Sequence, residues 1–272
     1  MARELVIVKI GGSIITGREK ETINFQGLSR IADELRDACK SKQLIVVHGG
    51  GSFTHHLSAD YRLYEGAKDE RDRINAAIIQ GNMMRLNLIF VKSLHERGVP
   101  AISVVPSTST ITREGRILKF DLEPMRLALS SGFVPVANGD ISLDYSKVVS
   151  DSPTEGLVGY LAMQLAPEKV IIATDVDGTF TTNPKKDSCA KLISTVDERN
   201  IAQVIEAVKP SDGYGGEMFS KVASLYGISA SASSECQIVN ANVPGRLYGA
   251  ITGEKVIGTM IKARPNGLKG LY

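Results

Sequence analysis

Short apolar segments alternate with longer segments of helical periodicity along the chain. Most of the apolar segments are rich in β-branched residues, which predicts buried strands of a parallel sheet. Apolar side chains that recur every three or four positions predict the helices between them. The predicted strands cover residues 4–10, 43–47, 101–105, 133–137, 169–174, 236–240 and 256–260. The predicted helices cover residues 25–39, 74–98, 123–130, 155–165 and 195–208. Two further segments, residues 108–120 and 143–149, are predicted to form hairpins. This alternation predicts an α/β protein with parallel strands, and 272 residues suffice for one large domain or two small ones.

The longest helical pattern, residues 74–98, carries apolar side chains on more than one face, and Gly98 and Pro100 end it. We therefore expect both sides of this helix to be buried. Two of its apolar residues, Met83 and Met84, are close in sequence to a glycine-rich loop. Methionines in this position suit a flexible apolar pocket, although such residues more often belong to the core.

Glycine-rich turns follow several predicted strands, at the edge where open α/β sheets bind ligands. Consecutive glycines leave backbone N–H groups unobstructed and permit a positive φ, which suits a loop that closes on an anion. A lysine beside such a turn adds positive charge, so a Lys-Gly-Gly-Ser cluster can hold phosphate. These segments are residues 9–13, 49–51, 138–140 and 211–221, and the last opens a helix that contains Lys221. The plainer alternatives are ordinary strand-to-helix turns and a surface lysine.

Two carboxylates, Asp175 and Asp177, follow the predicted strand 169–174. A carboxylate pair at the carboxyl end of a strand commonly orients a ribose, a lysine or a Mg²⁺ ion. Asp-x-Asp-Gly is also an ordinary turn sequence, so this pair alone does not decide between these roles.

Charge and composition exclude several classes of protein. The 272 residues include 32 basic and 30 acidic side chains, a balance that does not favour a nucleic-acid-binding surface. The three cysteines, Cys39, Cys189 and Cys236, have no C-x-x-C spacing and fit reduced thiols in a cytoplasmic protein. The first residues do not resemble a signal peptide, and no stretch approaches the roughly 20 apolar residues of a membrane span.

Several familiar catalytic motifs do not occur in the sequence. It contains no P-loop motif, no dinucleotide-binding glycine pattern after the first strand, no H-E-x-x-H and no nucleophile elbow. The remaining prediction is a sheet edge that collects cations and N–H donors. Such an edge suits phosphoryl transfer, because that reaction depends on positioning and charge stabilisation.

The order of four motifs resembles the amino acid kinase superfamily. These motifs are Lys9-Ile10-Gly11-Gly12-Ser13, Gly49-Gly50-Gly51, Asp175-Val176-Asp177-Gly178 and Gly215-Gly216 followed by Lys221. Within the superfamily, the segment 48–53 followed by His55 is similar to the isopentenyl phosphate kinases, as are the segments 13–16 and 132–136.

This resemblance implies a single domain over residues 1–272, built as a three-layer αβα sandwich on a mainly parallel sheet, and a homodimer. It also implies that residues 1–165 bind the phosphate acceptor and that residues 166–272 bind ATP with Mg²⁺. The implied reaction converts isopentenyl phosphate and ATP to isopentenyl diphosphate and ADP, in an alternative mevalonate route to isoprenoids. The length of prenyl chain that the site accepts is left open.

The resemblance further implies roles for single residues. Lys9 would bridge the transferring phosphate, and His55 would hydrogen-bond the acceptor phosphate, so its charge should tune affinity near neutral pH. Arg18 replaces a flap lysine of the family, and its guanidinium can clamp phosphate with a different geometry. The implied catalytic residues are Lys9, Arg18, His55 and Lys221, the acceptor-binding residues are Gly50, His55 and Gly139, and the nucleotide-binding residues are Lys9, Gly11, Gly12, Ser13, Gly51, Asp175, Gly216 and Lys221.

Two departures from the family pattern leave alternatives open. Thr54 stands where the family has glycine, so His56 is a rival to His55. The family's Ser-Gly-Asp-Asp segment is replaced by residues 150–155, so either Asp151 or Glu155 takes the place of its acid. Two other functions also remain: a kinase of another small phosphate or phosphonate, similar to the fosfomycin kinases, and a non-catalytic nucleotide-binding protein.

Overall fold

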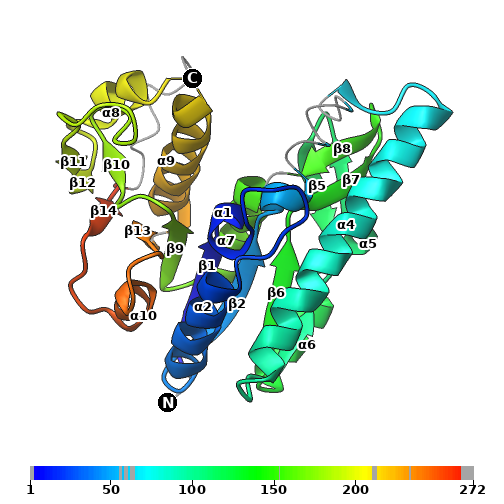
Figure 1. The fold of residues 1–272 in the computed structure, drawn as a ribbon, viewed down its shortest axis with the longest axis horizontal. Helices are drawn as coiled ribbons and strands as arrows, with labels where there is room; N and C mark the ends of the chain where they lie inside the picture. Colours follow the sequence, from blue (N-terminus) through cyan, green and yellow to red (C-terminus); the bar gives the residue numbers. More distant parts are fainter. Residues whose placement is uncertain are drawn as a thin grey trace.

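This computed structural model describes residues 3–54, 57, 61, 65–152, 154–209, 213–232 and 234–264. An eight-stranded sheet forms the centre of this part of the chain (Figure 1). The strand order is β12 (Thr195–Val196), β14 (Gly258–Ile261), β13 (Glu235–Asn240), β9 (Lys169–Thr174), β1 (Leu5–Ile10), β2 (Gln43–His48), β6 (Val134–Asn138) and β3 (Ala101–Ser103). Neighbouring strands are parallel except β13 and β14. The sheet is therefore mainly parallel, as the sequence predicts.

Helices cover both faces of this sheet. Alternate residues of β1 point to opposite faces: Val6, Val8 and Ile10 belong to one buried cluster, and Ile7 belongs to the other. The first cluster includes residues of α2 (Phe25–Ala38), α4 (Glu70–His95) and α10 (Arg246–Thr252), and the second includes residues of α6 (Glu123–Ser130), α7 (Thr154–Leu165), α8 (Ile201–Ala207) and α9 (Gly213–Ala232). The molecule is a three-layer αβα sandwich, which confirms the predicted fold.

The two predicted hairpins are present and join into one four-stranded sheet. Its strand order is β5 (Arg116–Phe120), β4 (Thr110–Arg113), β7 (Asp140–Asp144) and β8 (Val148–Ser152). The hairpins meet because β4 and β7 pair in parallel. The shorter elements are α1 (Gly12–Ile15), η1 (Gly51–Phe53), α5 (Pro106–Ser109), β10 (Thr179–Phe180) and β11 (Leu192–Ile193).

The helix predicted over residues 195–208 is wrong in its first part. Thr195 and Val196 form β12, which pairs with β14, and α8 begins only at Ile201. The side chain of Asn200 turns the chain between them, since it donates to the carbonyl of Thr195 and accepts from the N–H of Asp197. Pairing with a distant strand overrides the local helical pattern here.

The longest helix also differs from the prediction. It begins at Glu70 because Asp69 caps it, with the carboxylate accepting a hydrogen bond from the N–H of Asp72. One face of α4 is exposed rather than buried, and Ile74 and Leu88 on it are 54% and 67% exposed. Strand β3 is likewise only partly buried, because it lies at the edge of the sheet.

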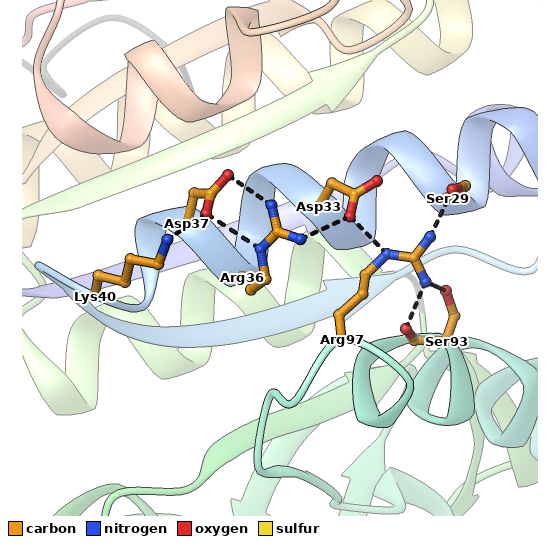
Figure 2. Close-up of polar contacts among 7 residues, drawn as sticks. All are labelled: Ser29, Asp33, Arg36, Asp37, Lys40, Ser93 and Arg97. Carbon is orange, nitrogen blue, oxygen red and sulfur yellow. Dashed lines mark hydrogen bonds and ion pairs between the residues drawn. The ribbon is translucent and has the colours of Figure 1, made fainter.

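Arg97, two residues beyond the end of α4, ties this helix to α2 (Figure 2). Its guanidinium donates to the Oδ1 of Asp33 over 2.9 Å and to the Oγ of Ser29 over 2.5 Å on α2. The same group donates to the carbonyl oxygen and the Oγ of Ser93 on α4. These bonds fasten together two helices that cover the same face of the large sheet.

No helix in the described part of the chain is long and apolar enough to cross a membrane.

Candidate active site

A cleft of about 1020 Å³ opens at the carboxyl ends of β1, β2, β6 and β9. The predicted site residues that line it are Lys9, Gly11, Gly12, Ser13, Arg18, Gly50, Gly51, Gly139, Asp175, Gly216 and Lys221. His55 and its rival His56 lie outside the described residues. The structure therefore brings together every described residue that the sequence assigns to the site.

Hydrogen bonds between neighbouring strands carry the glycine turns to one edge of the sheet. The N–H of Gly11 donates to the carbonyl of Ala173 over 2.8 Å, and the N–H of Gly49 donates to the carbonyl of Ile10 over 2.9 Å. The N–H of Gly139 donates to the carbonyl of His48, also over 2.9 Å. Each turn thus continues the ladder of its strand by one bond before the chain leaves the sheet.

The first two glycine turns approach each other so closely that a side chain would not fit. A Cβ atom on Gly12 would lie 2.2 Å from the backbone nitrogen of Gly51, which has a φ of +50°. A Cβ atom on Gly50 would lie 2.0 Å from the Oγ1 of Thr54 and 2.8 Å from the Sδ of Met83. The backbone contact requires glycine at position 12, the positive φ favours glycine at position 51, and a side chain at position 50 would displace Thr54 or Met83.

His48 fixes the end of β2 just before the triple glycine. Its ring is fully buried, with Nε2 3.1 Å from the Oδ1 of Asn87 on α4 and Nδ1 3.2 Å from the carbonyl of Gly49. Burial lowers the pKa of His48, which favours the neutral ring. Its role is structural: it joins the glycine loop to the helix behind it.

A buried ion pair lies on the floor of the cleft. The Nζ of Lys9 is 3.0 Å from the Oε1 of Glu155, and the two side chains are only 7% and 14% exposed. Burial lowers the pKa of Lys9, and the charge of Lys221 lowers it further, against the opposing effect of Glu155. Burial acts to raise the pKa of Glu155, but Lys9 and Lys221 outweigh it and hold that pKa below its usual range. Glu155 therefore keeps a negative charge between two cations.

The structure thus places Glu155 in the cleft. It lies in the first turn of α7 and contacts Lys9, although the two residues are 146 positions apart in the sequence. The side chain of Asp151 is outside the described part of the structure. In the sequence, Glu155 was indicated only by segment 150–155, which stands in place of the family's Ser-Gly-Asp-Asp. That segment contains both Asp151 and Glu155, and the sequence did not distinguish between them.

The two carboxylates after β9 have different partners. Asp175 lines the cleft, and its Oδ2 lies 2.5 Å from the Nζ of Lys185, which also lines the cleft. Asp177 instead pairs with Arg246 and accepts a hydrogen bond from Asn240, which fastens the turn to the end of β13 and to α10. Sequence reasoning missed Lys185, because no motif or spacing separates it from other loop lysines.

The other end of the cleft has an apolar wall. Ile79 and Met83, one turn apart on α4, are nearly fully buried and line the cleft beside Gly50 and Gly139. Arg18 reaches the same cleft from a short hairpin that follows α1. The sequence places two methionines near this loop, and the structure shows that Met83 is buried and Met84 exposed.

Comparisons with known proteins agree with this geometry. A profile of the Amino acid kinase family matches residues 4–240. Isopentenyl phosphate kinase of Methanothermobacter thermautotrophicus is 35% identical over 96% of this chain and 100% of that protein. The enzyme of the same name from Methanocaldococcus jannaschii is 31% identical over 94% of this chain and 98% of that protein.

Solved structures show the same fold. X-ray structures of isopentenyl phosphate kinase include a chain that is 34% identical, with a TM-score of 0.83 over 95% of this chain and 100% of that one. UMP kinase from Ureaplasma parvum, at 12% identity and a TM-score of 0.68 over 96% of this chain and 100% of that one, shares the fold alone. The chain therefore belongs to the amino acid kinase family and, within it, to the isopentenyl phosphate kinases.

Proposed function

We propose that this protein transfers the γ-phosphoryl group of ATP to isopentenyl phosphate, giving isopentenyl diphosphate and ADP. The observation that carries this proposal is the cleft in which two buried lysines, Lys9 and Lys221, flank two interlocked glycine turns. Phosphoryl transfer needs such an arrangement because charge develops on the oxygens of the transferring group and must be stabilised. The similarity to isopentenyl phosphate kinases over nearly the whole chain supports the choice of acceptor.

The chain's own groups supply the positioning and charge that this reaction requires. Lys9 bridges the transferring phosphate and Lys221 holds the nucleotide phosphates. Glu155 pairs with the ammonium group of Lys9, and Glu217, which also lines the cleft, pairs with that of Lys221. The acceptor is a phosphate monoester whose oxygen is already a nucleophile, so no side chain needs to act as a base. Arg18 closes on the phosphates from its hairpin.

The two halves of the chain divide the substrates between them in this proposal. Residues 1–165 bind isopentenyl phosphate, with its phosphate on Gly50, His55 and Gly139 and its prenyl tail against Ile79 and Met83. The burial and apolar character of these two α4 side chains support this direction for the tail. A charged acceptor such as an amino acid would need a buried cation or amide at this wall.

Residues 166–272 bind ATP with Mg²⁺. The nucleotide-binding residues on this side are Asp175, Gly216 and Lys221. Lys185, which pairs with Asp175 and lines the same cleft, is a fourth. No group of three or more metal-ligating side chains that could hold a metal ion lies within the described ranges. Mg²⁺ commonly keeps several waters and binds substrate phosphates with only one or two carboxylates, so the carboxylate of Asp175 fits an ion that enters with ATP.

The protein acts as a homodimer in this proposal. The exposed apolar face of α4 and the neighbouring edge strand β3 are surfaces that a second copy would cover.

The cysteines Cys39, Cys189 and Cys236 are all free thiols, which suits the reducing cytoplasm.

A panel of acceptors tests the function. Purified protein is given ATP and Mg²⁺ with isopentenyl phosphate, with fosfomycin or with no acceptor, and both ADP and the phosphorylated product are measured. We expect turnover with isopentenyl phosphate. Turnover of fosfomycin alone would reassign the acceptor, and tight ATP binding without ADP formation would indicate a non-catalytic protein.

The role of His55 is tested with His56 as its matched control. We expect His55→Ala to raise KM for isopentenyl phosphate with little change in KM for ATP, because the role proposed for His55 is to bind the acceptor phosphate. His56→Ala should leave both values near those of the wild type. The reverse pattern would assign the role to His56.

A further inference from the structure

A short hairpin carries Arg18 to the cleft. Thr16 and Ile23 form an antiparallel bridge, and the N–H of Gly17 donates to the carbonyl of Thr22 over 2.9 Å. Arg18 follows directly and lines the cleft. The direction of its guanidinium therefore depends on what holds the hairpin in place.

The hairpin is attached first to the glycine loop. The N–H of Ser52 donates to the Oγ1 of Thr16 over 3.1 Å, and the Oγ of Ser52 donates to the carbonyl of Thr22 over 3.3 Å. The N–H of Glu21 donates to the carbonyl of Ser52 over 3.2 Å. The hairpin and the phosphate-binding turn thus share Ser52 as a common support.

A second attachment runs to α4 through the side chain of Glu21. Its Oε2 accepts a bond from the Nη1 of Arg85 over 2.7 Å, and its Oε1 accepts one from the Nδ2 of Asn82 over 3.1 Å. Asn82 is buried and also donates to the carbonyl of Phe53, whose ring lies 5.7 Å below the guanidinium of Arg85. Glu21 is therefore the point at which the hairpin, the glycine loop and α4 meet.

The backbone of Glu21 is strained in this arrangement. Its φ is 54°, in the left-handed region that glycine or asparagine occupies at lower cost. Strain of this kind persists when the surrounding contacts over-determine the conformation. Here those contacts are the two bonds from the carboxylate to α4.

We propose that Glu21 is a positioning residue, which latches the hairpin onto Asn82 and Arg85 so that Arg18 faces the cleft. The latch residues alternate along α4 with Ile79 and Met83, which line the cleft. The wall of the acceptor pocket and the support of Arg18 therefore lie on the same two turns of one helix. This inference rests on the proposed function, because it assigns Arg18 to the phosphates of that reaction.

A double-mutant cycle tests the latch. We expect Glu21→Ala and Arg18→Ala each to lower kcat/KM about ten- to hundredfold, since misplacement of a charged group by about 1 Å has effects of that size. The double variant should be no worse than Arg18→Ala, because the latch acts through Arg18. Additive losses, or no loss in Glu21→Ala, would overturn the proposal. Lys92→Ala, an exposed cation on the same helix, is the matched control and should keep wild-type activity.

A charge exchange tests whether the carboxylate of Glu21 and the guanidinium of Arg85 pair in solution. Arg85→Glu alone should lower activity, because it places two carboxylates together. Addition of Glu21→Arg should restore most of the loss if the two side chains pair in solution. A double variant that is as impaired as Arg85→Glu contradicts the latch.

Hydrogen exchange separates failure of the latch from failure of the proposed function. In Glu21→Ala, the amides of residues 17–22 should exchange at least about tenfold faster than in the wild type, because the hairpin opens more often. This measurement needs no turnover. A wild type without kinase activity would overturn the function, whereas unchanged exchange in the variant would overturn the latch.

Discussion

The Nζ of Lys9 lies 3.0 Å from the Oε1 of Glu155, and neither side chain is more than 14% exposed. This pair joins the end of the first strand to the start of α7 at the floor of the cleft. Each charge depends on the other, because an isolated buried charge is costly. The pair therefore links the stability of the cleft to the ionisation of the lysine that we propose binds the transferring phosphate.

Removal of the Glu155 charge should shift the pH dependence of catalysis. Burial and Lys221 already lower the pKa of Lys9, and Glu155 opposes them. In Glu155→Gln that opposition is lost, so the pKa of Lys9 falls further and the lysine loses its proton at a lower pH. We expect kcat to fall about 10²-fold or more at neutral pH, and the alkaline limb of its pH profile to move to lower pH.

The pH profile of kcat, measured for the wild type and Glu155→Gln, checks this prediction. Glu206→Gln on α8, which breaks an exposed ion pair with Lys209, is a suitable control and should leave the profile unchanged. Superimposable profiles for Glu155→Gln and the wild type would show that the carboxylate does not support the charge of Lys9.

A methyl group at Gly12 should abolish activity. The Cβ atom of Gly12→Ala would lie 2.2 Å from the nitrogen of Gly51, so one of the two glycine turns must move. By contrast, a Cβ atom at Gly227, inside α9, meets nothing within 4 Å. Gly227→Ala should therefore stabilise the protein by about 0.5–1 kcal/mol through its helix propensity. Steady-state kinetics and thermal unfolding of both variants distinguish a local clash from a general intolerance of glycine replacement.

The carboxylate of Asp144 should contribute strongly to stability. It accepts hydrogen bonds from Thr112 and from the backbone N–H groups of Glu114, Gly115, Ser146 and Lys147. Burial acts to raise the pKa of Asp144, but these donors outweigh it and hold the pKa well below its usual range. We expect Asp144→Asn to lower the free energy of unfolding by about 2–3 kcal/mol at neutral pH.

The effect of this substitution should depend on pH in one direction. A carboxyl with a lowered pKa in the folded state contributes stability above its unfolded pKa, near 4, and loses it as the pH falls toward the folded value. The difference between the wild type and Asp144→Asn should therefore be constant above about pH 5 and shrink in acid. Denaturant unfolding at several pH values measures it, and a difference that grows in acid would be contrary to this account.

Relief of backbone strain at Val148 should stabilise the protein. This β-branched residue has a φ of 70° and is 48% exposed, so its side chain contributes little to packing. Val148→Gly should raise the free energy of unfolding by about 1 kcal/mol, or Tm by about 2–4 °C. Val148→Ala keeps a Cβ atom at the same φ and should gain less. A lower Tm for Val148→Gly would mean that the side chain supports the turn before β8.

The secondary structure that the sequence predicted well is the part that depends on neighbouring residues. Strand β9 and helix α6 have the predicted bounds, because buried apolar runs and helical periodicity are properties of short segments. Residues 195–208 failed for the opposite reason. Their helical pattern is real, but Thr195 and Val196 pair with Met260 and Ile261, more than sixty positions away.

The same distinction applies to the site. The order of the glycine turns and of Lys9, Asp175 and Lys221 along the chain indicated a phosphate-binding edge, because parallel strands bring their carboxyl ends together. The sequence did not identify the contact of Glu155 with Lys9 or the place of Lys185. Both depend on which distant side chain reaches the cleft.

Tertiary structure alone decided which charged side chains pair and which apolar faces remain exposed. The contacts of Lys9 with Glu155, of Asp175 with Lys185 and of Glu21 with Arg85 join separate segments, and the first of these pairs is buried. The exposed face of α4 is likewise decided by the elements that pack against the helix, since its apolar residues alone predicted burial on both sides. Local patterns set the elements and their order, whereas burial and long-range pairing set the chemistry of the cleft.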